Sequence, residues 1–83
     1  MRVTILGKYW SFVRGRCPPD TLGLCCPTTR TLTVKPSLRG QRELDTIIHE
    51  AMHAGDWHKT EEWVDQFSTD LAKLLWKLGY RKE

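Results

Sequence analysis

One five-residue stretch, His49-Glu50-Ala51-Met52-His53, constrains this chain more than any other feature of its sequence. It has the form H-E-x-x-H and stands in a segment whose apolar residues have helical spacing. Side chains four positions apart lie on one face of a helix, so the two imidazoles can reach the same ion. Glu50 lies about 100° around the helix from His49, where it can hold a water molecule beside that ion. The stretch therefore predicts zinc as the cofactor, His49 and His53 as two of its ligands, and Glu50 as the catalytic residue.

The length of 83 residues fits a single domain, residues 1–83, with a thin hydrophobic core. A hydrophobic content of 40% that includes four tryptophans is typical of a globular chain and not of a disordered one. No apolar run reaches the roughly 18 residues that a membrane-spanning helix needs. Residues 1–7 have too short an apolar run for a signal peptide and lack a small-residue cleavage site. We therefore expect a cytoplasmic protein that does not contact a membrane.

The net charge of +3 is unevenly distributed along the chain. Residues 1–42 contain eight Lys or Arg and one acidic residue, a net charge of +7. Residues 43–83 contain five Lys or Arg and nine acidic residues, a net charge of −4. The simplest interpretation is a solvated basic sheet beside an acidic helical layer. Aromatic residues are interleaved with basic ones over residues 8–14, so a nucleic-acid partner is a second interpretation.

Three cysteines, Cys17, Cys25 and Cys26, lie in a stretch that is rich in proline and glycine. Their odd number, and the adjacency of two of them, exclude a full disulfide framework. A Cys17–Cys25 bridge is compatible with a hairpin loop, but free thiols are the rule in a reducing cytosol.

The N-terminal part, residues 1–36, has the pattern of a small β-sheet. Residues 2–14 mix β-branched and aromatic residues with polar ones and predict a strand that Gly7 splits with a bulge or turn. Residues 15–30 predict a long irregular connection, since Pro18, Pro19 and Pro27 interrupt regular structure. Residues 31–35 alternate and predict a further strand that ends before Pro36. We expect two to three antiparallel strands.

The C-terminal part, residues 37–83, has the pattern of two helices, which makes the predicted fold class α+β. The first helix begins at Ser37 or Gly40 and ends near Gly55. Its apolar stripe is predicted to face the sheet and consists of Leu44, Ile47, Ile48 and Ala51. Both histidines project roughly opposite this stripe, so either another element covers them or they are exposed.

The second helix has Thr60 as its predicted N-cap and ends near Leu78, with Gly79 closing it and residues 80–83 forming a tail. Its predicted buried stripe consists of Val64, Phe67, Leu71, Leu74, Leu75 and Leu78.

The third zinc ligand is predicted to follow the H-E-x-x-H motif closely. Glu61 is favoured because helical geometry turns it toward the facing helix, while Glu62 points to water. His58 and Glu62 are the alternatives, followed by Asp56. Asp65 is predicted to accept a hydrogen bond from a ligand histidine, with Asp70 as its rival for that role.

The motif, followed by a second helix that bears acidic residues, resembles the zincin metallopeptidases of the minimal gluzincin type. In that type a glutamate ligand is followed four residues later by a carboxylate, as Glu61 is followed by Asp65. Residues 43–81 also resemble small predicted metallopeptidases encoded by bacteriophages, which implies the host cytoplasm as the location. SprT-like and ImmA/IrrE-type proteases are more distantly similar. The metzincin pattern fails, because Asp56 and Lys59 stand where it requires glycine and histidine.

These features predict a zinc-dependent metallopeptidase that hydrolyses peptide bonds with Glu50 as general base. The strand Thr31–Lys35 is predicted to be a sheet edge that pairs with an extended peptide or protein substrate. One alternative is a zinc-stabilised binding module without turnover, because metal binding can supply folding energy to so small a chain. Another is a nucleic-acid accessory factor that uses the basic N-terminal half. Nothing in the sequence indicates an oligomeric state.

Overall fold

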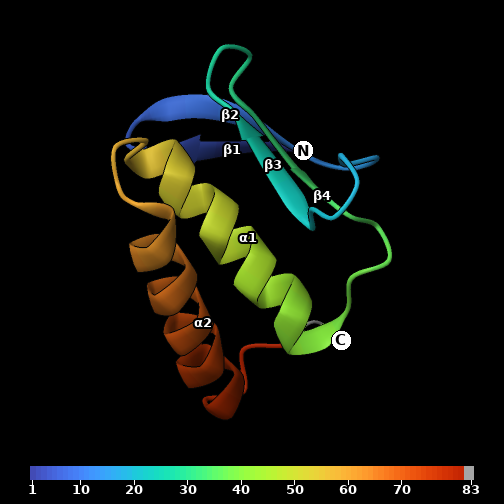
Figure 1. Ribbon diagram of the computed structural model, residues 1–83, viewed down its shortest axis with the longest axis vertical. Coiled ribbons are helices and arrows are strands. Elements are labelled where there is room, and N and C mark those ends of the chain that lie inside the picture. The colour runs from blue at the N-terminus through green and yellow to red at the C-terminus, as the bar shows by residue number, and fades with distance from the viewer. Residues whose placement is uncertain (82–83) are drawn as a thin grey trace.

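The computed structural model describes residues 1–81, which form a four-stranded sheet followed by two helices (Figure 1). The strands are β1 (Arg2–Ile5), β2 (Lys8–Arg14), β3 (Gly23–Cys26) and β4 (Thr31–Val34); the helices are α1 (Gly40–Gly55) and α2 (Glu61–Lys77). The predicted α+β class is confirmed. The last two residues of the predicted tail, Lys82 and Glu83, lie outside the described residues. Neither helix is long and apolar enough to cross a membrane.

Gly7 splits the first predicted strand into the hairpin β1–β2, as expected. Ile5 pairs with Lys8, so the loop consists of Leu6 and Gly7 alone. Both residues have a positive φ, 49° and 77°. Two-residue loops of this kind match the twist of an antiparallel pair, and glycine adopts such a φ without strain.

The prediction of two to three antiparallel strands is wrong in number, and one of the three strand pairs, β2–β4, is parallel. The sheet has four strands in the order β1-β2-β4-β3. β4 runs parallel to β2, with Ser11 paired to Thr31, and antiparallel to β3. A parallel neighbour requires a crossover of a dozen or more residues, and the connection between β2 and β4 is long enough to provide it.

The predicted irregular connection over residues 15–30 is also wrong, since it contains β3. The prolines do not prevent this strand, because Pro18 and Pro19 precede it and Pro27 follows it. β3 takes the outer position in the sheet and β4 lies between β2 and β3. The edge predicted at Thr31–Lys35 is therefore an inner strand, and the free edge on this side is β3.

The hydrophobic core lies between the sheet and α1, and consists of Trp10, Phe12, Cys25, Leu32, Val34 and Leu38. α1 crosses one face of the sheet and α2 packs on α1 (Figure 1). α1 spans Gly40–Gly55, as predicted, and presents Ile47, Ala51 and Ala54 to the core. Its three buried residues, however, are the polar Glu43, Thr46 and Glu50.

The predicted bounds of α2 are confirmed, but its buried stripe is partly wrong. The Thr60 hydroxyl accepts a hydrogen bond of 3.2 Å from the Trp63 amide and caps the helix, and Gly79, with φ +90°, follows its end. Val64 is buried, whereas Phe67, Leu74 and Leu78 are exposed. Small residues, Ser68 and Ala72, take the buried positions because α2 packs on one helix and not on the sheet.

Candidate metal centre

His49 and His53 lie one turn apart on the side of α1 that α2 covers. Their ring centroids are 4.9 Å apart, and their side chains are 15% and 12% exposed. Of the two alternatives left open by the sequence, the structure shows the covered one, and the covering element is the N-terminal part of α2. Both imidazoles are held in a largely water-excluded position between two packed helices.

Glu61, in the first turn of α2, brings its carboxylate to both imidazoles. Its Oε1 lies 2.8 Å from His49 Nε2 and its Oε2 lies 2.9 Å from His53 Nε2. Ligand atoms of these three residues lie within 4.8 Å of one another, a group that could hold a metal ion. Glu61 thus lies where the favoured third ligand was predicted.

The donor set fits zinc. Two imidazole nitrogens and one carboxylate are ligands that zinc takes in catalytic sites, where a fourth position stays open. Tetrahedral donors at the usual bond lengths lie about 3.4 Å apart. The group would have to open by about half an ångström to admit the ion, which a side chain as exposed as Glu61 can accommodate at little cost.

Asp65 holds the other ring nitrogen of His49. Its Oδ1 lies 3.1 Å from His49 Nδ1, which leaves Nε2 directed at Glu61. A carboxylate in this position fixes the tautomer of a metal-binding histidine and raises its basicity. Asp70, the rival predicted for this role, instead accepts a hydrogen bond of 3.2 Å from Gln66.

The structure does not bring the alternative ligands into this group. The backbone amide of His58 donates a hydrogen bond of 3.0 Å to Asp56 Oδ1, and both side chains are exposed in the loop before α2. Glu62 lines a shallow depression on the outer surface of α2. Trp57 belongs to no motif that singles it out in the sequence, but its ring meets His53 edge to face at 5.8 Å.

Glu50 is only 8% exposed and faces β3. Burial raises the pKa of its carboxyl group, against the opposing effect of His49 and His53. The described residues donate no hydrogen bond to its carboxylate. Because no buried side-chain oxygen among the described residues lacks a partner, the Glu50 oxygens are accessible, and they open onto the two cavities that this residue lines.

Those two cavities, of about 380 and 400 Å³, share Gly23, His49, Glu50 and Glu61. The first extends toward Asp20 and Asp45, and the second extends toward Leu24, Trp57 and Lys59. His49, Glu61 and Glu50 therefore lie where two hollows on the molecular surface meet.

Cys25 is buried at the wall of the second cavity. Burial, and to a smaller degree the charge of Glu50, raises the pKa of its thiol to about 11. Cys17, Cys25 and Cys26 are all free thiols in the structure, so the Cys17–Cys25 bridge considered above is not formed.

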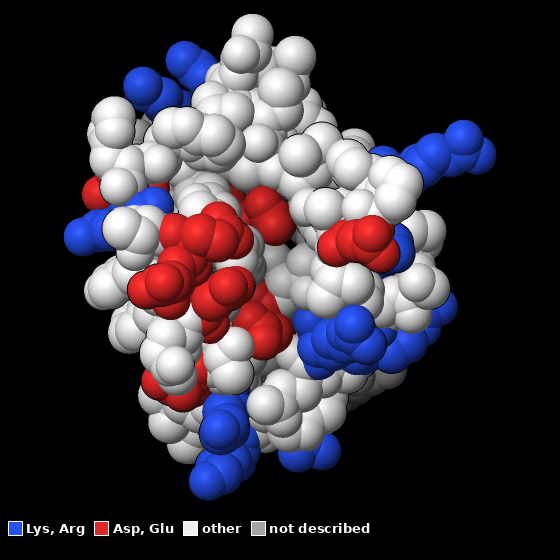
Figure 2. Space-filling view, viewed as in Figure 1, with Lys and Arg blue, Asp and Glu red and all other residues white. Residues whose placement is uncertain are grey.

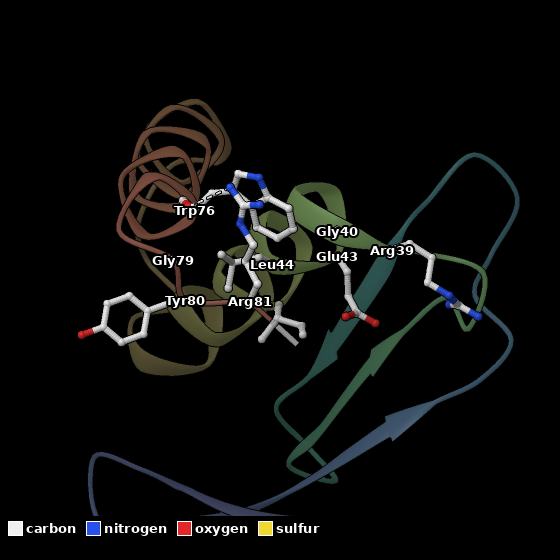
Figure 3. Close-up of a pocket in the computed structure, with 9 residues that line it drawn as sticks. Arg39, Gly40, Glu43, Leu44, Trp76, Gly79, Tyr80 and Arg81 are labelled. Carbon is white, nitrogen blue, oxygen red and sulfur yellow. Dashed lines mark hydrogen bonds between the residues drawn. The ribbon is translucent and has the colours of Figure 1, made fainter. Parts of the chain in front are cut away.

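A further cavity, about 590 Å³, lies between the N-terminal half of α1 and the end of α2 (Figure 3). The Arg81 guanidinium lies 4.2 Å from the Trp76 ring and donates a hydrogen bond of 3.3 Å to the Trp76 carbonyl. Among the described residues, Glu43 is the one carboxylate in its lining, and no predicted site residue contributes to it. This cavity is separate from the metal centre.

Comparisons of the chain with protein families, curated proteins and solved structures find no match.

Proposed function

We propose that this protein is a zinc-dependent peptidase. One observation carries the proposal: the Nε2 atoms of His49 and His53 converge on the Glu61 carboxylate beside the buried Glu50. The three residues would hold zinc, and Glu50, one position from His49, remains available for proton transfer.

Glu50 is suited to the role of general base. When bound, zinc supplies a Lewis acid that lowers the pKa of water to about 7 and polarises a carbonyl oxygen. Glu50 accepts the proton of the attacking water and passes it to the nitrogen of the leaving amine as the C–N bond breaks.

The substrate would lie along β3. This strand is the free edge beside the metal centre, and Gly23, its first residue, lines both cavities. An extended peptide can pair with the open backbone groups of such an edge and present its side chains to the cavities on either side. The proposed substrate-pairing edge is therefore β3, in place of the strand Thr31–Lys35 expected from the sequence, because β4 is an inner strand.

Replacing Glu50 with glutamine tests the proposal. Zinc content measured by elemental analysis should be unchanged, while hydrolysis of a mixed peptide library, followed by mass spectrometry, should fall by about 10²–10⁴-fold. Glu62→Gln, an exposed change outside the metal group, is the matched control and should retain activity. Full activity in Glu50→Gln would contradict the proposed role.

The alternative function is a zinc-stabilised binding module without turnover, and removal of zinc from the wild-type protein tests it. It would be indicated by a wild-type protein that unfolds when zinc is removed and cleaves no peptide when zinc is bound. We also propose a cytoplasmic location, which the three free thiols favour.

A further inference from the structure

We propose that the cavity beside Asp20 and Asp45 is a subsite for a positively charged substrate side chain, lysine or arginine. The inference rests on the peptidase function proposed above and names the substrate class of the same site. We call this cavity the acidic subsite; Asp20, Asp45, Glu50, Glu61 and Asp65 contribute its carboxylates and Arg42 its one Lys or Arg.

The charge of the acidic subsite is not neutralised by partners within the described chain. Among its carboxylates, Glu61 contacts the imidazoles of His49 and His53, and Asp65 contacts that of His49. Arg42 lines the cavity but forms no ion pair with any of its carboxylates among residues 1–81. Zinc would engage Glu61, and Asp65 would remain with His49, which leaves Asp20 and Asp45 for a ligand.

Asp45 is the built element of the subsite. Its Oδ1 accepts a hydrogen bond of 2.9 Å from the hydroxyl of Ser68, which is fully buried, and its Oδ2 accepts one of 3.0 Å from Thr69. Two hydroxyl donors on α2 fix the orientation of the carboxylate but do not cancel its charge. An oriented carboxylate on the wall of a cavity is suited to an ammonium or guanidinium group.

Glu50 provides a second observation at this cavity. It is more than nine-tenths buried, no described residue donates a hydrogen bond to it, and its carboxylate oxygens open onto the acidic subsite and the second cavity. The reacting group would therefore lie beside the acidic subsite, which Asp45 also lines. At 380 Å³ the cavity is within the size range of ligand pockets.

The second cavity differs from the acidic subsite in its lining, so a lysine or arginine side chain is expected to prefer one side of Glu50 over the other. It presents Leu24, Cys25 and Trp57, together with the cation of Lys59. A peptide on the β3 edge would thus meet negative charge on one side of Glu50 and an apolar, basic surface on the other. Figure 2 shows a patch of acidic side chains over the helices and, across a hollow from it, a further acidic group beside basic side chains.

Zinc-anchored peptide hydroxamates test the subsite without requiring turnover. Two series extend from the hydroxamate in opposite chain directions, and each has a lysine, a norleucine or a glutamate side chain beside the zinc-binding group. In the series that reaches the subsite, the zinc-loaded protein should bind the lysine compound about tenfold more tightly than its uncharged isostere norleucine, and the glutamate compound more weakly. Calorimetry measures the three affinities directly.

Asp45→Asn and Asp20→Asn should each reduce the lysine preference about threefold, while Glu62→Gln, which removes an acid outside the cavity, should leave it unchanged. The second variant keeps the test decisive if the first does not fold. Equal affinities for the three side chains in both series would overturn the subsite and leave the peptidase proposal intact. Absence of any zinc-dependent hydroxamate binding would overturn the metal centre itself, and the subsite with it.

Discussion

Gly23 on β3 and Glu50 on α1 lie so close that the site has no room for a side chain between them. A β-carbon at Gly23 would be 2.9 Å from Glu50 Cγ and 3.1 Å from Glu50 Oε2. The absence of a side chain at one strand position therefore determines where the proposed catalytic carboxylate can lie.

Gly23→Ala should displace Glu50 while leaving the metal ligands in place. A misplacement of about 1 Å in a catalytic group can cost about 10²-fold, so we expect peptide hydrolysis to fall roughly 10- to 100-fold. Zinc affinity should change little. Gly15→Ala is the matched control, because its β-carbon would be an ordinary 3.8 Å from Thr33 Cγ2. Equal activity of the two variants would show that the close approach has no effect on catalysis.

The fold class, the hairpin turn and both helices follow from the sequence because they depend on local patterns. Gly7 identified the β1–β2 turn, Thr60 and Gly79 identified the ends of α2, and the spacing around His49 identified α1. Strand order does not follow from such patterns. The parallel pairing of β2 with β4 depends on which distant segments pack together, and no local residue specifies it.

We predict that Glu61 is the third zinc ligand and that its neighbour Glu62 is not. Glu61→Gln should reduce zinc affinity by about 10²-fold or more, since it removes one of three protein ligands. Glu62→Gln and His58→Ala should retain wild-type affinity, because neither side chain joins the group. Competition with a chromogenic chelator measures all three. Loss of zinc in His58→Ala alone would transfer the third position to the loop before α2.

Asp65 should affect zinc binding through His49. Asp65→Asn keeps the shape of the side chain but removes the charge that orients the imidazole, and should weaken zinc binding about 10- to 100-fold. Asp70→Asn, five residues along α2, should have no effect because Asp70 contacts Gln66. The same chelator titration compares the two. An equal loss in both variants would indicate a general effect of charge on α2 instead of the His49 contact.

Cys25 should react slowly with iodoacetamide and show a steep dependence on pH. Its folded-state pKa, about 11, is above the ordinary 9.0, so at pH 8 the thiol keeps its proton, and its rate should rise about tenfold for each pH unit up to pH 10. Hydrogen bonds from Thr29 lower the pKa of Cys26, which should react first. Mass spectrometry of digests locates each adduct, with urea-unfolded protein as the control. If Cys25 and Cys26 of the folded protein reacted with iodoacetamide at equal rates at pH 8, the result would contradict the burial of Cys25.

The same proton linkage makes alkaline pH destabilising. The folded state retains the Cys25 proton more strongly than the unfolded state does, so this contribution to the free energy of unfolding is present below pH 9 and is lost as the pH rises toward 11. Cys25→Ser should shift the alkaline unfolding midpoint upward.

The part of the candidate site that lies on the helices was predictable from the sequence, and the part that strand β3 contributes was not. His49, Glu50 and His53 form a local pattern. The angle of 100° per residue around α2 predicted that Glu61, and not Glu62, faces the two histidines, and Glu61 does contact both. β3 was missed because Pro18, Pro19 and Pro27 obscured it. The short apolar run Leu22-Gly23-Leu24-Cys25-Cys26 between those prolines was the available signal.

A crystal structure of the zinc-loaded protein, with data collected on both sides of the zinc absorption edge, tests the central claim most directly. We predict one anomalous peak bonded to the Nε2 atoms of His49 and His53 and to the Glu61 carboxylate, with Glu50 unbonded to the metal and Asp65 on His49 Nδ1. Zinc bound elsewhere, or no peak between the two imidazoles, would contradict the account.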